Sequence, residues 1–159
     1  RGLGDVYKRQ AYYNSPFGII QIGYEKETLL LLKLVKKIGE KNEISNFTHK
    51  VYQQICEYLD GERKNFDISY IFHGTKFQEM VWHTLEKIPY GSTMTYGEVA
   101  KYIENPNATR AVGKACNANP IWLIVPCHRV IGKHHSLIGY AYGVDMKEKL
   151  LQIEQSHIL

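Results

Sequence analysis

The spacing of apolar residues in the first half of the chain predicts a small α/β unit between Tyr12 and Phe72. Short apolar runs at 19–22 and 28–35 are separated by a polar turn, which is typical of two neighbouring strands. The leucine-rich second run suits a helix by propensity and a strand by its shortness, so this pattern alone leaves both open. Residues 66–72 alternate between apolar and polar side chains, which predicts a third strand.

Three further stretches carry apolar residues at helical spacing. The first covers Ser45 to Leu59 and should stop at Gly61, because glycine often ends a helix. The second covers residues 76–87, and a last helix is expected at 145–154. The boundary between two domains should lie near residue 73, after the last predicted strand.

Two short helices lie between these stretches and have helix-turn-helix spacing. Residues 95–98 match a capping box, so a helix should begin at Thr95 and continue to about residue 103. A turn at 105–107 precedes a second helix at 108–117, with Asn107 as its expected cap. Helix hairpins are also common in proteins that never touch DNA, so this spacing alone is weak support for a DNA-binding role.

The composition is that of an ordinary globular protein. The chain has 159 residues, 44% of them apolar and 23% charged, which suits one domain or two small ones. No apolar run approaches the roughly 18 residues that span a bilayer, and no secretory signal pattern opens the chain, so we expect no membrane partner. The net charge of +4 permits a polyanionic partner without requiring one.

The cysteines indicate free thiols. Cys56, Cys116 and Cys127 are few and odd in number, which favours a reducing compartment over a disulfide framework. We therefore expect a cytoplasmic protein, or a nuclear one if the organism is a eukaryote. The chain has no CxxC pair, and its histidines and cysteines lack zinc-site spacing, so neither a metal nor another cofactor is expected.

The candidate chemistry centres on Cys127, which stands between Pro126 and His128 after the apolar run 121–125. Proline should end or bend a buried strand there and present the sulfur. A neighbouring histidine or arginine favours the thiolate, the reactive form of cysteine. The alternative for an arbitrary Cys-His pair is an inert buried cysteine beside a surface histidine.

The wider segment resembles the active-site region of the O6-alkylguanine-DNA alkyltransferases. The resemblance rests on Asn119-Pro120, the block Pro126-Cys127-His128-Arg129-Val130, the upstream Arg110-Ala111-Val112-Gly113 and the downstream Gly139-Tyr140-Ala141. It covers about half the chain. It implies an α/β N-terminal domain with a small sheet and a helix, followed by a mainly α C-terminal domain with a helix-turn-helix. It also favours a strand at 28–35.

The residue pattern and the resemblance together give the expected domain limits. We expect an N-terminal domain at 11–72 and a DNA-binding and alkyl-acceptor domain at 73–159. Residues 1–10 show neither strand alternation nor a helical stripe, and we expect an artefact or a disordered extension there.

The resemblance also implies a catalytic set. Cys127 would be the nucleophile, and His128 would accept its proton directly or through water. Glu154 would orient the imidazole, and Asn119 would hold the turn before the active-site segment. Tyr96 would crowd the target phosphate and donate a proton to the leaving purine. Taken alone, Glu154 would be a solvated residue at a helix end and Tyr96 a partly exposed aromatic residue.

The same resemblance places the helix at 108–117 in the minor groove of double-stranded DNA. Its small residues keep one surface thin, although tight packing inside the protein would explain them equally well. Arg110 would fill the base stack when the target base leaves it. The DNA contacts implied are Thr95, Tyr96, Arg110, Ala111, Gly113, Lys114 and Asn117.

The pocket for the base is expected around Val130, Tyr140 and Ala141, which match the family's lining residues. Tyr142 stands where the family commonly has glycine, so it should reduce the size of adduct that is accepted. His134 and His135 lie in the intervening loop and receive no role.

The expected function is single-turnover repair of O6-alkylguanine in DNA by a monomer, because a thioether on Cys127 has no easy hydrolytic exit. One alternative is a non-catalytic protein of the same architecture that binds the lesion, although relatives of that kind have lost the cysteine. Another is a thiol hydrolase or redox enzyme, which would leave the helix with Arg110 unexplained.

Overall fold

The computed structural model describes residues 9–158, which form two compact units. Unit 1 contains the described residues up to His73 together with Pro120–Trp122, and unit 2 contains the rest. The main division lies between His73 and Gly74. The expected extension falls mostly on residues 1–8, outside the described residues, while Arg9 and Gln10 belong to a strand.

Unit 1 is built on a three-stranded antiparallel sheet in the order β1-β2-β3. Its strands are β1 (Arg9–Ser15), β2 (Gly18–Glu25) and β3 (Thr28–Val35). The strands expected near 19–22 and 28–35 are confirmed, and the open choice at 28–35 resolves to a strand. The β1 strand was not predicted, because its sequence shows no clean alternation.

The third strand predicted at 66–72 is wrong. Only Tyr70 in this stretch forms a bridge, which pairs it with Leu29 of β3. The amide of Leu29 donates to the Ser69 carbonyl at 2.9 Å. The alternating side chains therefore follow an extended segment beside β3 that makes too few ladder bonds to count as a strand.

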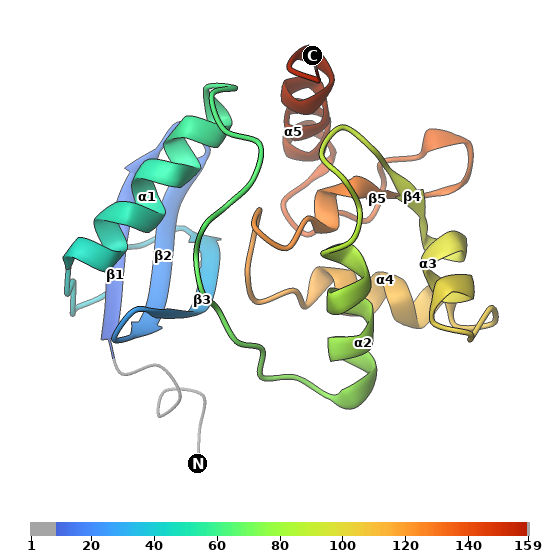
Figure 1. Cartoon of the computed structure of the whole chain (residues 1–159), viewed down its shortest axis with the longest axis horizontal. Coiled ribbons are helices and arrows are strands. Elements are labelled where there is room, and N and C mark those ends of the chain that lie inside the picture. The colour runs from blue at the N-terminus through green and yellow to red at the C-terminus, as the bar shows by residue number, and fades with distance from the viewer. Residues whose placement is uncertain (1–8, 159) are drawn as a thin grey trace. The chain divides into compact units, whose positions relative to one another are not determined.

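Helix α1 (Asn46–Leu59) packs on one face of this sheet (Figure 1). Ser45 caps its first turn in a reciprocal capping box, and Gly61 follows its end at a φ of 80°, as the pattern predicted. Tyr52 of the helix stacks on Tyr13 of β1 with ring centroids 4.3 Å apart.

The segment 120–122 belongs to the sheet unit through its backbone. The Leu32 amide donates to the Pro120 carbonyl and the Trp122 amide donates to the Leu32 carbonyl, each at 2.8 Å. The strand predicted at 121–125 is nevertheless wrong, because Ile121 forms a single bridge and Leu123 adopts a φ of 72°. A left-handed residue cannot continue a strand, so the chain turns there.

Unit 2 is mainly helical, as expected. Its elements are α2 (Lys76–Leu85), β4 (Met94–Thr95), α3 (Tyr96–Tyr102), α4 (Thr109–Asn117), the 3-10 turn η2 (Cys127–Arg129), β5 (Val130–Ile131), the 3-10 turn η3 (Lys133–His135) and α5 (Val144–Ser156). β4 and β5 pair in parallel. Among the described residues, no helix is long and apolar enough to cross a membrane.

The helix-turn-helix is formed by α3 and α4. Thr95 caps α3 in the predicted capping box, whereas α4 begins after Ala108 without a side-chain cap, so the role predicted for Asn107 is wrong. The indole of buried Trp82 in α2 donates to the Ala115 carbonyl of α4 at 2.8 Å. This bond satisfies two buried polar groups and joins α2 to the second helix of the motif.

Candidate active site

Cys127 begins the turn η2, directly after Pro126. Its amide donates to the Val125 carbonyl at 2.9 Å, and the Arg129 amide donates to the Pro126 carbonyl at 3.0 Å. These bonds fold the chain back at the proline, and only 7% of Cys127 is exposed. The sulfur is therefore held inside unit 2 by a tight turn, rather than at the end of a strand.

Asn119 holds this turn from the preceding segment. Its side-chain amide donates to the Val125 carbonyl at 2.8 Å. Burial raises the pKa of the Cys127 thiol, while a hydrogen bond from the Asn119 side chain and the nearby Lys147 ammonium lower it. Asn119 thus both fixes the backbone before the cysteine and favours its thiolate.

Lys147 is the main site residue that the sequence analysis missed. It lies on α5 and is fully buried, and its Nζ has no hydrogen-bond partner among residues 9–158. The Nζ lies 5.6 Å from the ring centroids of both Tyr96 and Tyr140. The available signal was its spacing from Leu150 and Glu154, which places all three on the buried face of one helix.

The charge state of Lys147 depends on two thiols. Burial lowers its pKa, and the nearby Cys127 and Cys116 sulfurs oppose that shift. Cys116 lies on the buried face of α4, where burial raises its thiol pKa. A buried ammonium without a hydrogen bond is costly unless an anion lies near it, so Lys147 and a thiolate stabilise one another.

Glu154 and His128 form a buried pair, as the resemblance implied. The His128 Nε2 donates to Glu154 Oε2 at 2.7 Å, and the two side chains are 0% and 1% exposed. The Gly91 amide donates to Glu154 Oε1 at 2.9 Å. Burial raises the pKa of Glu154, but hydrogen bonds and charge from His128 and Arg129 outweigh it and lower the pKa to about 2.

Arg129 is the second residue that sequence reasoning missed. Its Nε donates to Glu154 Oε1 at 2.9 Å, and its Nη2 donates to Glu154 Oε2 at 3.0 Å. A third bond joins its Nη1 to the Ile88 carbonyl. Arginine suits this position because its planar guanidinium can bond both carboxylate oxygens at once.

This pairing sets the state of His128. Burial lowers the pKa of the imidazole, and the Glu154 carboxylate only partly opposes that shift because Arg129 already neutralises it. A neutral ring that donates from Nε2 carries its lone pair on Nδ1. The imidazole is therefore suited to accept a proton at Nδ1.

Tyr96 joins the site from the start of α3. Burial and the nearby Cys116 and Cys127 sulfurs raise its pKa to about 12, so its hydroxyl keeps its proton at neutral pH. A Cβ added at Gly113 would lie 4.0 Å from the ring, and one added at Gly139 would lie 4.0 Å from the hydroxyl. Tyr96 thus lies against α4 and the loop before α5.

The outer face of α4 is exposed and basic. Arg110, Ala111, Lys114 and Asn117 are exposed, whereas Val112, Ala115 and Cys116 face the core. Gly113 is half-buried. Thr95 is also expected to contact DNA, but its hydroxyl accepts a hydrogen bond from the Glu98 amide at 3.0 Å. Small residues occur on the exposed face of α4 as well as on the packed one. They therefore fit both interpretations, a thin surface for DNA and tight packing inside the protein.

The residues expected to line the base pocket are only partly gathered. Val130 is buried in β5 and Tyr140 is buried near Lys147, while Ala141 is exposed. Tyr142 is half-buried and packs edge-on against Tyr140, with ring centroids 5.9 Å apart.

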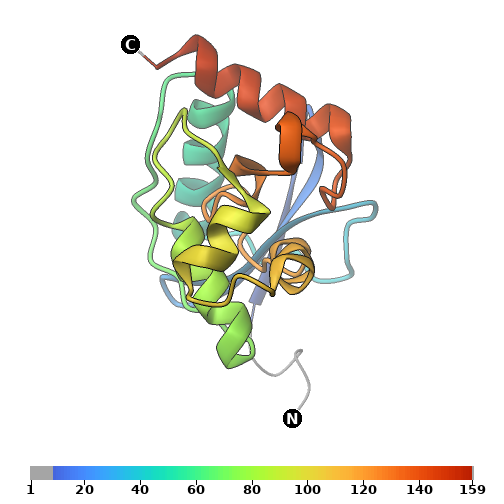
Figure 2. The same cartoon turned by 90° about the vertical axis from the view of Figure 1, so that its right-hand side faces the viewer.

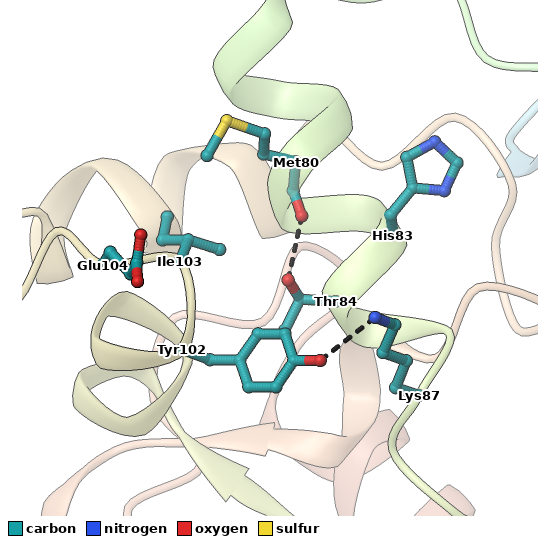
Figure 3. Close-up of a pocket in the computed structure, with 7 residues that line it drawn as sticks. All are labelled: Met80, His83, Thr84, Lys87, Tyr102, Ile103 and Glu104. Atoms are coloured by element: carbon teal, nitrogen blue, oxygen red, sulfur yellow. Dashed lines mark hydrogen bonds between the residues drawn. The ribbon is translucent and has the colours of Figure 1, made fainter.

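A surface pocket of about 350 Å³ lies elsewhere in unit 2, between α2 and the end of α3 (Figure 3). Its clearest polar contact joins Lys87 to the Tyr102 hydroxyl at 3.0 Å. None of the expected site residues lines it. Among the described residues, no group of three histidine, cysteine or acidic side chains could hold a metal ion.

Comparisons with known proteins agree over both units. Residues 76–156 match the model of the 6-O-methylguanine DNA methyltransferase DNA binding domain, and residues 8–70 match that of the ribonuclease-like domain of the same family. A methylated-DNA–protein-cysteine methyltransferase of Methanosarcina acetivorans is 46% identical over 154 residues, which cover 92% of this chain and 97% of that protein. The constitutive enzyme of Bacillus subtilis is 39% identical over 157 residues, covering 91% and 95%.

Solved structures show the same fold. A crystal structure of Mycobacterium tuberculosis OGT in complex with DNA superimposes with a TM-score of 0.87 at 38% identity, covering 94% of each chain. The resemblance found around Cys127 is therefore confirmed. The chain belongs to the methylated-DNA–protein-cysteine methyltransferase family of DNA repair enzymes.

Proposed function

We propose that this protein repairs double-stranded DNA by moving an alkyl group, mainly methyl, from guanine O6 to the sulfur of Cys127. The observation that carries the proposal is the pair of groups beside that buried sulfur, the Asn119 side chain and the Lys147 ammonium. Both groups favour its thiolate, and His128, the next residue along the chain, is a buried neutral ring bonded to Glu154. A structural cysteine in the same place would need neither a hydrogen-bond donor nor a buried cation.

The transfer is a direct displacement. The Cys127 thiolate attacks the alkyl carbon, the S–C bond forms as the C–O6 bond breaks, and the electron pair of that bond stays with the purine. The purine takes a proton and leaves as neutral guanine. The thioether that remains has no easy hydrolytic exit, so each protein molecule acts once. This chemistry needs no cofactor.

His128 and Lys147 have different tasks in generating the thiolate. The neutral imidazole accepts the thiol proton at Nδ1, directly or through water, while its Nε2 stays bonded to Glu154. Arg129 fixes Glu154 and balances the negative charge of its carboxylate. Lys147 supplies the positive charge that stabilises the sulfur anion.

Tyr96 is the proton donor to the purine. Its pKa, raised to about 12, keeps the hydroxyl protonated until negative charge develops on the leaving base. The Lys147 ammonium over its ring favours that donation, because a positive charge stabilises the developing phenolate.

The DNA is bound through α4, with the target base extruded from the duplex. The exposed face of α4 is thin where its residues are small, which allows close approach to the minor groove. Arg110 is exposed at the first turn of the helix and would fill the vacated stack. The protein would act as a monomer where the cell keeps its DNA, in a prokaryotic cytoplasm or a eukaryotic nucleus.

The test is incubation with duplex DNA carrying O6-methylguanine, followed by peptide mapping. A methyl group on the peptide that contains Cys127 supports transfer. Tight binding of the damaged duplex without any methylated peptide would instead identify a lesion-binding protein of the same architecture. If the protein neither bound the damaged duplex nor became methylated, both functions would be rejected.

A further inference from the structure

The surface pocket between α2 and the end of α3 is not used by the proposed reaction (Figure 3). Its seven lining residues come from these two helices and from the turns directly after them. Figure 2, in which the right-hand side of Figure 1 faces the viewer, shows α2 and α3 next to each other, and the two helices are in contact. A molecule bound in this pocket would therefore leave the exposed face of α4 available for DNA.

The walls of the pocket are apolar and half exposed. Met80 is 44% exposed and Tyr102 is 54% exposed, although large apolar side chains are usually buried. The Thr84 hydroxyl donates to the Met80 carbonyl at 2.9 Å, so this polar group is already bonded (Figure 3). Sites for small molecules enclose most of their ligand, whereas tyrosine and methionine are enriched where proteins meet. The exposed walls therefore suit a side chain of another protein better than a free small molecule.

Opposite charges lie on the two sides of these walls. Figure 3 shows Lys87 on one side of the pocket and Glu104 on the other. The Lys87 ammonium donates to the Tyr102 hydroxyl at 3.0 Å, which holds it at the pocket. An acidic residue on a partner suits Lys87, and a basic residue suits Glu104. The Glu104 carboxylate would repel the phosphates of a nucleic acid, so these charges favour a protein as the partner.

The backbone at Glu104 is strained. Its φ of 61° lies in the left-handed region, which favours glycine directly after a helix. The Glu104 amide donates to the Lys101 carbonyl at 2.9 Å. The Asn105 amide donates to the Ala100 carbonyl at 2.9 Å, and the two bonds end α3 in a motif that glycine usually closes. Glutamate is an unfavourable choice there if only the fold matters, and strained residues of this kind gather at functional sites.

We propose that this pocket binds a segment of a partner protein. An apolar side chain of that segment packs on Met80 and Tyr102. An acidic residue of the segment lies at Lys87, and a basic residue lies at Glu104. The strained backbone is retained because the Glu104 carboxylate selects that basic residue. The inference goes beyond the repair reaction, because it gives the protein a contact surface outside its catalytic residues and outside the exposed face of α4.

The test is the selection of a random peptide library, displayed on phage, against the whole protein. The selected peptides should share an apolar residue between an acidic and a basic residue. As free synthetic peptides, they should bind Lys87→Glu and Glu104→Lys several-fold more weakly than wild type in isothermal titration calorimetry. The variant that combines both changes should prefer peptides in which the acidic and basic residues are exchanged.

Glu104→Gly separates binding from folding. Glycine adopts a positive φ without strain, so the melting temperature should stay the same or rise while the peptide affinity falls several-fold. Transfer from free O6-methylguanine base to Cys127 should keep its rate. Lys26→Gly is the matched control, because Lys26 is exposed in unit 1 and has a φ of 55°. This change removes the same kind of strain elsewhere and should leave the peptide affinity unchanged.

Lys101→Ala is the second control, because Lys101 is exposed on α3 and lies outside the lining of the pocket. It should also leave the peptide affinity unchanged. The proposal is overturned if the selection yields no peptide with this charge pattern, or if the selected peptides bind Lys87→Glu and Glu104→Gly as tightly as wild type. It is also overturned if duplex DNA displaces the selected peptides, because the pocket would then belong to the DNA-binding surface.

Discussion

The His128 imidazole and the Glu154 carboxylate lie 2.7 Å apart and are almost completely buried, and Arg129 bonds the same carboxylate. The cluster therefore holds one cation and one anion in contact, with a neutral ring beside them. Its charge balance makes Glu154 a structural residue as well as an orienting one. That dual role predicts a measurable dependence of stability on pH.

Glu154→Gln should destabilise the protein by about 3–5 kcal/mol, because it leaves the Arg129 charge buried without an anion. The folded-state pKa of Glu154 lies well below its usual 4.5, at about 2. Its ionisation therefore adds stability above pH 4.5, and that stability is lost as the pH falls toward 2. The shift corresponds to about 3 kcal/mol.

Urea unfolding from pH 6 to pH 2 measures this effect in wild type and Glu154→Gln. The difference in unfolding free energy between the two should shrink toward the acid end. A constant difference across the range would mean that Glu154 does not carry the predicted ionisation.

Lys147→Met should slow transfer strongly while the protein stays folded. Replacing a buried lysine by an apolar side chain of similar length removes a desolvation cost, so the melting temperature should not fall. The Cys127 thiol loses its stabilising cation, so its pKa should rise further. The alkylation rate with iodoacetamide, followed against pH, should shift to higher pH.

Lys149→Met is the matched control, because Lys149 is exposed on the same helix. It should leave the alkylation profile unchanged. If Lys147→Met and Lys149→Met gave the same profile as wild type, the thiolate would not depend on Lys147.

The helices of this protein were predictable because their signals are local. Ser45 and Thr95 cap their helices as the residue spacing indicated. The strands were harder, because β1 lacks alternation and the stretch 66–72 alternates without enough pairing to form a strand. Pairing partners lie far away in the sequence, and no local pattern records them.

The site was predictable to a similar extent. The resemblance named His128 and Glu154, which form a buried pair, and Asn119, whose side chain bonds the Val125 carbonyl before Cys127. Lys147 and Arg129 were missed because lysine and arginine normally mark a solvated surface, so their residue type argued against burial. Only the helical spacing of Lys147 from Leu150 pointed to a buried face.

Arg110→Ala should slow the repair of duplex DNA far more than the reaction with free O6-methylguanine base. The reason is that only the duplex reaction requires a base to leave the stack. Single-turnover rates on both substrates measure the effect. Lys114→Ala, one turn along the same exposed face, should mainly lower the salt dependence of binding. Equal losses on both substrates for Arg110→Ala would mean that the residue supports the fold.

Tyr142 should disfavour bulky adducts. Its ring packs edge-on against Tyr140, beside the buried Lys147, and forcing a large group into a filled site costs about 1–3 kcal/mol. That corresponds to roughly a 5- to 150-fold preference for O6-methylguanine over O6-benzylguanine. Tyr142→Gly should bring the transfer rates from O6-methylguanine and O6-benzylguanine closer together, with both substrates supplied as free bases. An unchanged ratio would show that Tyr142 does not border the pocket.

Single, irreversible transfer to Cys127 can be measured by titration followed by intact-mass analysis. Protein is incubated with increasing duplex DNA that contains one O6-methylguanine, and repaired DNA and methylated protein are counted together. Both should rise in parallel and stop at one methyl group per protein, and Cys127→Ala should bind the duplex without gaining mass. Repaired DNA in excess of protein, or a methyl group gained by Cys127→Ala, would contradict it.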